Sequence, residues 1–173
     1  MENAWEIDSN ESDVIIKTKH SLISYMPGKR NNFKGHVAIQ NNEVEDASIE
    51  FSFNADDKNI ASKEKNENSK SIESFDNNEA PLIQFKSTSF QKINKNINFL
   101  KGFLTIKNIT KVVELDTEFL GFNNYDGVEK ASFEITGNIN RNDFGLNQNM
   151  LRKNKFTPVS KEIKLIANLE FTH

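Results

Sequence analysis

The sequence predicts an all-β protein whose strands form a closed antiparallel barrel. Apolar and polar residues alternate along about eight segments, which is typical of strands with one dry face. Turn-forming pairs, such as Asn41-Asn42 and Asp126-Gly127, separate these segments. Consecutive hairpins with one dry face favour a meander closed into a barrel, because closure removes exposed sheet edges. A two-sheet sandwich is the alternative.

The alternation assigns one set of side chains to the dry face of each predicted strand. In chain order these sets are Val14, Ile16, Thr18 and His20; Phe33, Gly35, Val37 and Ile39; Ile49, Phe51 and Phe53; Ile83 and Phe85; Gly102, Leu104 and Ile106; Val113, Leu115, Thr117 and Phe119; Phe133, Ile135, Gly137 and Ile139; Ile163, Leu165, Ala167, Leu169 and Phe171. The opposite phase should face solvent, as at Lys107, Glu114, Glu118, Glu134 and Lys164. The fourteen phenylalanines either fill a core or line a cavity.

Length and composition limit the classes of function. The chain has 173 residues, which suits one domain over residues 1–173. It has no cysteine, and therefore no disulfide framework and no thiolate site. The net charge is −3 with no basic stripe, so nucleic acid is not an expected partner. No apolar run approaches the roughly 20 residues that span a bilayer as a helix. The oligomeric state stays open, with a homodimer as one alternative.

The first ten residues, MENAWEIDSN, lack a positive n-region and an apolar h-region. We expect a cytoplasmic protein if Met1 is the native start, and a periplasmic one if a signal peptide was removed.

One polar, lysine-rich segment, NADDKNIASKEKNENSKSIESFDNNEAP, shows no period of two. It predicts a loop with a short helix anchored by Ile72 and Phe75. This segment is either a solvated connection or a lid over one barrel end.

Catalytic and metal motifs are absent from the sequence. The histidines His20, His36 and His173 have no metal-binding spacing, and no GxSxG, P-loop or dinucleotide fingerprint occurs. We therefore expect no catalytic residue, no metal and no enzyme activity.

Several motifs, in the correct order, resemble those of the YceI family. They are WEIDSNESDVIIKTKH, FKGHV, SIESFDNNEAPLIQFKSTSF, KGFLTIKNITKVVEL and GNINRNDFGLN. The chain departs from the family pattern at Asn108, where Gly is usual, and at Val112, where Pro is usual. The family's Arg-Asp pair before its short helix is not found. The resemblance implies a lipocalin-like eight-stranded antiparallel β-barrel with a short helix or lid segment. It also implies an isoprenoid lipid, a polyprenyl phosphate or an isoprenoid quinone, bound inside.

The polar residues Arg141 and Asp143 continue the dry face of their strand past Ile139. We expect both to lean inward near one barrel end, as His20 does on its own strand. Arg141 then either donates hydrogen bonds to a lipid head group, assisted by His20, or forms a structural ion pair with Asp143.

The predicted ligand-binding residues combine the inner wall with these polar groups. They are Ile16, His20, Phe51, Phe53, Phe85, Leu104, Ile106, Leu115, Phe119, Phe133, Ile135, Arg141, Asp143 and Leu165. Two alternatives stay open. One is an enzyme acting on an isoprenoid, with His20 or Asp143 as general base, and the other is a filled-core barrel that serves a protein partner.

Overall fold

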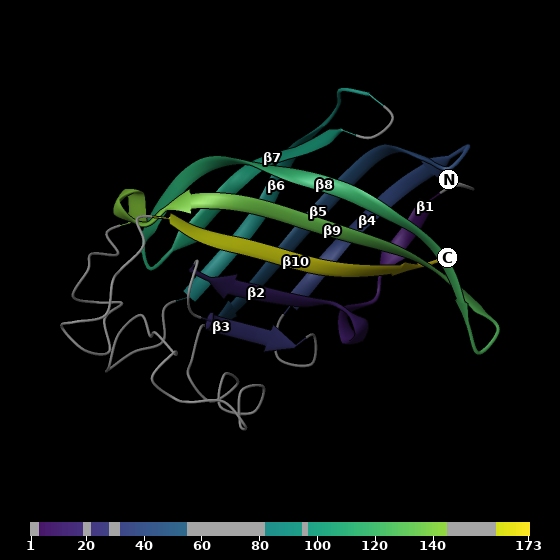
Figure 1. Ribbon diagram of the computed structural model, residues 1–173, viewed down its shortest axis with the longest axis horizontal. Helices are drawn as coiled ribbons and strands as arrows, with labels where there is room; N and C mark the ends of the chain where they lie inside the picture. The colour runs from purple at the N-terminus through teal and green to yellow at the C-terminus, as the bar shows by residue number, and fades with distance from the viewer. Residues whose placement is uncertain (1–3, 19–21, 28–31, 55–81, 95–96, 145–161) are drawn as a thin grey trace.

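The computed structural model describes residues 4–18, 22–27, 32–54, 82–94, 97–144 and 162–173. Within these ranges the chain is almost entirely strand, with two short 3-10 helices (Figure 1). The elements are β1 (Ala4–Ile7), η1 (Ser9–Glu11), β2 (Asp13–Lys17), β3 (Leu22–Pro27), β4 (Asn32–Gln40), β5 (Glu43–Asn54), β6 (Leu82–Lys92), β7 (Asn98–Ile106), β8 (Ile109–Tyr125), β9 (Val128–Asn140), η4 (Arg141–Phe144) and β10 (Glu162–Thr172).

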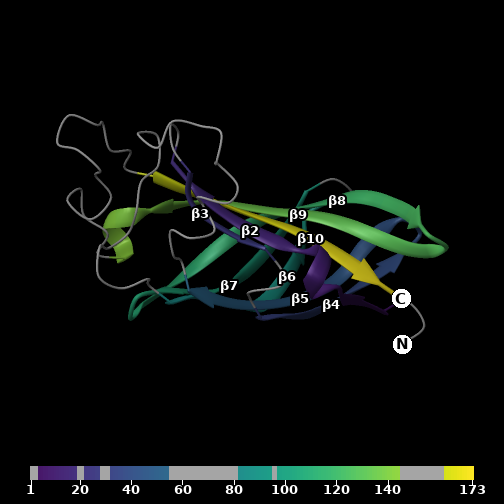
Figure 2. The ribbon, with the colours of Figure 1, turned by 90° about the horizontal axis from the view of Figure 1, so that it is seen from below.

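Eight of the strands form a closed antiparallel ring. Its order is β1-β4-β5-β6-β7-β8-β9-β10, and β10 pairs back to β1. Figure 2 shows β8, β9 and β10 on one side of this barrel and β4 to β7 on the other. The hairpin of β2 and β3 joins the ring through β10. The prediction of an eight-stranded antiparallel barrel is therefore confirmed.

The alternation did not predict β1 or β3 as separate strands. β1 ends at Ile7, and the short helix η1 separates it from β2. The side chain of Asp8 accepts a hydrogen bond from Asn10 N at 3.2 Å and caps η1. As a result β10 pairs with β1 through Phe171 and Thr172, and with β2 through residues 164–168.

The two barrel ends differ in their connections. At one end, here called the hairpin end, lie the tight turns after β4 and β8 and the C-terminus of β10 (Figure 1). The other, the η4 end, carries η4 and the turn between β7 and β8. The segment predicted as loop or lid, with Ile72 and Phe75, lies outside the described residues.

The predicted turns at the hairpin end are confirmed. Asn41 and Asn42 have φ of 55° and 62°, and Asp126 and Gly127 have φ of 52° and 81°. Two successive positive φ values characterise the type I′ turn, whose twist matches that of the flanking strands. At the η4 end the turn of residues 107–108 has its positive φ, 62°, at Lys107.

The inner face has the phase that the sequence predicts. β7 and β10 alternate strictly between buried and more exposed positions, and Leu104, Ile106, Leu165 and Ala167 are all buried. A β-bulge between Phe119 and Gly121 shifts the register of β8 by one residue.

This bulge keeps both Phe119 and Phe122 on the inner side, because Phe119 pairs with Phe133 and Phe122 pairs with Ala131. The rings of Phe119 and Phe133 stack with centroids 5.0 Å apart, and Phe122 contacts the Trp5 ring at 5.4 Å. An aromatic cluster therefore lies at the hairpin end, with Phe122 still 36% exposed at its edge.

Candidate functional site

The barrel wall contains most of the predicted ligand-binding residues. Nine of them have only 0–3% of their surface exposed: Ile16, Phe51, Phe85, Leu104, Ile106, Leu115, Phe133, Ile135 and Leu165. Phe119 is partly buried and packs against the same cluster. The structure thus brings these side chains together on one apolar inner face.

Side chains fill the space along this wall. A wall bordering a wide water-filled tube would retain exposed surface on its inner side chains, and these nine retain almost none. The rings of Phe33, Phe51 and Phe85 contact one another in sequence, with centroids 5.7 Å and 5.6 Å apart. An apolar tail can therefore occupy this part of the barrel only if wall side chains move.

Arg141 lies at the η4 end, just past the last residue of β9. It is only 2% exposed and ranks among the largest fully buried side chains, beside Phe144 on the same 3-10 turn. A buried guanidinium is costly unless charge or hydrogen bonds compensate it. The predicted position of Arg141, leaning inward at a barrel end, agrees with this burial.

The prediction for Asp143 is wrong. Its side chain is exposed, and the described ion pairs do not include one with Arg141. The reason is that β9 ends at Asn140, and residues 141–144 form a 3-10 turn with three residues per turn. Positions two apart share a face in a strand but not in such a turn. The exposed carboxylate also removes the apolar setting that a general base at Asp143 would need.

Two predicted residues cannot be placed. His20 lies outside the described residues. Phe53 lies in β5 opposite Ile83, but its side chain is outside the described set.

Two polar residues on the inner face were not predicted as site residues. Asn98 and Thr117 are directly opposite each other in the β7–β8 ladder, 6% and 4% exposed. Among the described residues, neither Asn98 Oδ1 nor Thr117 Oγ1 has a hydrogen-bond partner, although both atoms are buried. Thr117 was on the predicted inner face. The predicted inner set of β7 began at Gly102, and extending the same alternation backwards to Leu100 and Asn98 would have found Asn98.

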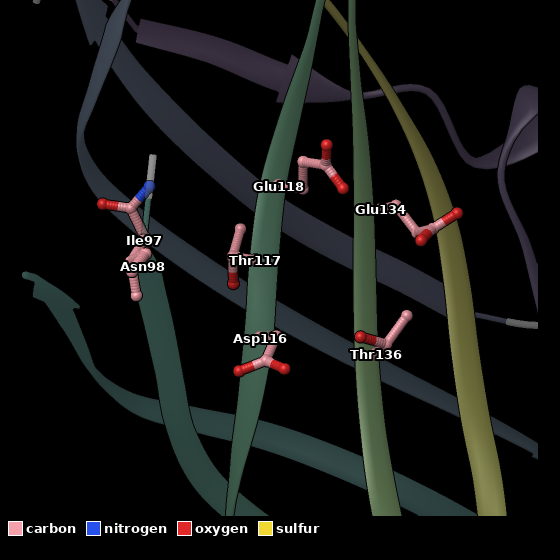
Figure 3. Close-up of a pocket in the computed structure, with 7 residues that line it drawn as sticks. All are labelled: Ile97, Asn98, Asp116, Thr117, Glu118, Glu134 and Thr136. Carbon is pink, nitrogen blue, oxygen red and sulfur yellow. The ribbon is translucent and has the colours of Figure 1, made fainter. Parts of the chain in front are cut away.

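A pocket of about 400 Å³ adjoins this pair (Figure 3). Its lining combines Asn98 and Thr117 with side chains of the outer face: Ile97, Asp116, Glu118, Glu134 and Thr136. Inner and outer residues meet here because β7 begins at Asn98, so the β7–β8 ladder stops at Thr117.

Metal binding finds no support in this part of the chain. Within the described ranges, no group of three or more His, Asp or Glu side chains could hold a metal ion. None of the helices in those ranges is long and apolar enough to cross a membrane.

Comparison with solved structures identifies similar barrels. BcnA from Burkholderia cenocepacia aligns over 95% of this chain and 98% of its own, with a TM-score of 0.58 and 15% identity. The YCEI protein of Campylobacter jejuni aligns over 83% of this chain and 84% of its own, with a TM-score of 0.54 and 21% identity. At these identities the likeness shows the fold.

Comparison of sequences extends over nearly the whole chain. UPF0312 protein SA2479 from Staphylococcus aureus strain N315 is 27% identical over 97% of this chain and 96% of its own length. The UPF0312 protein SAS2572 from strain MSSA476 is 28% identical with the same coverage. The family model described as YceI-like domain matches residues 5–171. The chain therefore belongs to the YceI family.

Proposed function

We propose that the protein binds a long-chain isoprenoid or a similar amphiphilic lipid and catalyses no reaction. The apolar tail lies within the barrel, and an anionic head group, such as that of a polyprenyl phosphate, lies near Arg141. The protein then serves as a carrier, a store or a sequestering protein for this lipid.

The burial of Arg141 at the end of an apolar inner face carries the proposal. A guanidinium that is 2% exposed gains most from an anionic, hydrogen-bond-accepting neighbour. Arg141 already has an interaction within the chain, and its guanidinium carries five N–H donors that a phosphate at the η4 end would share, while the wall beyond it offers only apolar contact to a tail.

The energy of tail burial supports this division of roles. Each isoprene unit has five carbons, and burial of one CH₂ contributes about 0.8 kcal/mol, so a tail of eight units has a gross transfer term of some tens of kcal/mol. Measured affinities saturate near about −20 kcal/mol, because ordering the tail offsets much of that gain. The free energy of tail burial is therefore more than sufficient for tight binding. Selectivity for the head group must come from a few polar side chains.

The filled interior adds a requirement to the proposal. Since the wall side chains leave almost no inner surface exposed, the tail must displace rings such as Phe51 and Phe85. Lipid binding should therefore be accompanied by a change in aromatic packing, visible in the near-ultraviolet circular dichroism.

The direct experiment is mass spectrometry of an organic extract of the purified protein, followed by titration of delipidated protein with geranylgeranyl phosphate and geranylgeraniol. We expect tail-bearing compounds in the extract and tighter binding of the phosphate. Arg141→Leu should reduce that preference, because charge-assisted hydrogen bonds are roughly twice as strong as neutral ones. Asp143→Asn, on the same turn but exposed, is the matched control and should preserve it.

The proposal fails if the extract contains no lipid and neither probe binds the delipidated protein. An unchanged head-group preference in Arg141→Leu would remove the role of Arg141 but not the lipid.

A second candidate is a barrel with a filled core that serves a protein partner. Two observations favour it: the packed interior and an exposed apolar pair on the outer face, Phe103 and Val112, which lie opposite each other in the β7–β8 ladder and are 47% and 56% exposed. Absence of lipid binding in the titration above would favour this candidate.

A further inference from the structure

The pocket of Figure 3 lies beside β7, β8 and β9, and its described lining includes no residue of η4. Its volume of about 400 Å³ is within the range of small-molecule sites. The last described ladder pair between β7 and β8 is Asn98 with Thr117, and from Glu118 onward β8 has no described partner in β7. The backbone pairing of β7 and β8 therefore ends at this polar pair, which lines the pocket together with the outer side chains.

The outer lining of the pocket is acidic. Asp116, Glu118 and Glu134 contribute carboxylates, and the described lining contains no Lys or Arg. Glu118 and Glu134 are directly opposite each other in the β8–β9 ladder. Like charges at directly opposed positions destabilise a sheet, so a cation in the pocket would relieve an unfavourable arrangement.

The inner lining supplies hydrogen-bond acceptors. Asn98 Oδ1 and Thr117 Oγ1 are buried oxygens with no hydrogen-bond partner among the described residues. Buried polar atoms in native proteins are nearly always paired, and an exception calls for an explanation. A ligand that donates hydrogen bonds into the pocket provides one.

These properties select the chemistry of the ligand. The carboxylates repel an anion, and a neutral alcohol leaves the Glu118–Glu134 repulsion in place. A metal ion finds no set of three suitable ligands in the described ranges. A primary ammonium group has three donors and a compact positive charge, so it can meet the buried oxygens and the carboxylates together. An alkyl stem would lie against Ile97, the exposed apolar member of the lining.

We propose that this pocket binds a primary ammonium group carried on an alkyl stem. The group belongs either to a free alkylamine or to a lysine side chain, since both present the same chemistry. This site is independent of lipid binding inside the barrel.

The test is a calorimetric titration of the full-length protein at pH 7 with n-butylammonium, and with butan-1-ol and butyrate as neutral and anionic probes of the same length. We expect binding of n-butylammonium only. Thr117→Val removes a buried oxygen without changing the shape, and Glu118→Gln removes one carboxylate. Each should weaken binding by about tenfold, the scale of one lost hydrogen bond to a charged group.

Matched controls separate specific from general electrostatic effects. Glu114→Gln removes an exposed carboxylate on the same strand that does not line the pocket, and should leave the affinity within twofold. Raising the salt concentration should reduce the effect of Glu118→Gln, since screening acts on exposed charges, but not that of Thr117→Val.

A peptide with one central lysine, compared with its acetyl-lysine form, identifies the source. Tighter binding of the lysine peptide than of n-butylammonium indicates a protein lysine, and binding of n-butylammonium alone indicates a free amine.

Three results would overturn the inference. The first is that neither n-butylammonium nor the lysine peptide binds. The second is that butan-1-ol binds as tightly as n-butylammonium. The third is that the affinity for n-butylammonium is unchanged in Thr117→Val, or is reduced in Glu114→Gln as much as in Glu118→Gln. If Thr117→Val does not fold, Glu118→Gln and Glu114→Gln decide between these outcomes, because both positions are exposed.

Discussion

Replacement of Gly137 by Ala tests how tightly the interior of the barrel is filled. A Cβ at this position would approach Leu115 Cδ2 to less than 3.0 Å, whereas ordinary contact begins at 3.4 Å, so this methyl group must move by more than 0.4 Å. Leu115 is itself 1% exposed and has little room to move. Overpacking of this kind destabilises by about 1–3 kcal/mol, and the reduced entropy of the unfolded chain returns about 0.4–1 kcal/mol. We therefore expect a net loss of roughly 1.3 kcal/mol from the midpoints of these two ranges, between limits of about 0 and 2.6 kcal/mol.

The assay is urea denaturation followed by circular dichroism, applied to a double-mutant cycle. Leu115→Ala alone should cost about 2–5 kcal/mol. The double variant should lose less than the two single losses combined, because the methyl group added at position 137 occupies space that the Leu115 side chain has left. We expect a coupling of at least about 0.5 kcal/mol, the scale found for residues in contact.

Gly127→Ala is the control for the backbone effect of the same substitution. Nothing lies within 4 Å of its Cβ, and its φ is +81°, so the loss should reflect strain alone, about 1 kcal/mol. It should show no coupling to Leu115→Ala. Additive losses in the Gly137 cycle would refute the picture of a filled interior, because the added methyl group and the Leu115 side chain would then not share space.

The remaining predictions concern a surface ion pair, the core and the 3-10 turn. Hydrogen bonding to Glu43 and Glu45 of β5 raises the pKa of Lys92 above its ordinary 10.5. The folded state therefore holds this proton more tightly than the unfolded chain does, so the stabilisation is complete below about pH 10 and is lost as the pH rises through the raised pKa. The difference in urea midpoint between wild type and Lys92→Met should vanish in that range; a constant difference would contradict this. Phe133→Ala should cost about 3–5 kcal/mol and Phe103→Ala on the outer face much less, measured by thermal denaturation, and equal losses would contradict the assigned faces. Asp143→Asn should change the free energy of unfolding by less than about 0.5 kcal/mol. A loss near 3 kcal/mol would instead support a buried ion pair between Asp143 and Arg141.

The sequence was sufficient to predict the ring and the orientation of its strands. A strand has a side-chain period of two, so Leu115 and Ile135 could be assigned to the inner face without coordinates. What the period cannot reveal is an added residue. The bulge beside Gly121 brings Phe122 inward although it stands three residues after Phe119, an odd spacing. Gly121, with φ of +112°, is the signal that could have marked the bulge.

The candidate site was harder to predict for two physical reasons. Arg141 and Asp143 were assigned by extending a strand into residues that form a 3-10 turn, and a change of backbone period moves Asp143 to the outside. The pocket beside Asn98 depends on where one ladder ends, which is a property of strand stagger in the closed ring. Alternation shows which face a residue occupies but not which neighbouring strand stops beside it.

The narrow ladder between β1 and β10 has a consequence for the order of folding. Its described part consists of two pairs, Glu6 with Thr172 and Ile7 with Phe171. Glu6 and Thr172 are 166 residues apart in the sequence. Most other ladders of the ring connect strands that follow each other in the chain, and these can form as local hairpins. Contacts between distant residues form slowly, because the entropy of the intervening chain must be lost first. We expect the β1–β10 ladder to form last during folding and to open first during unfolding, with the apolar inner face exposed while the ring is open.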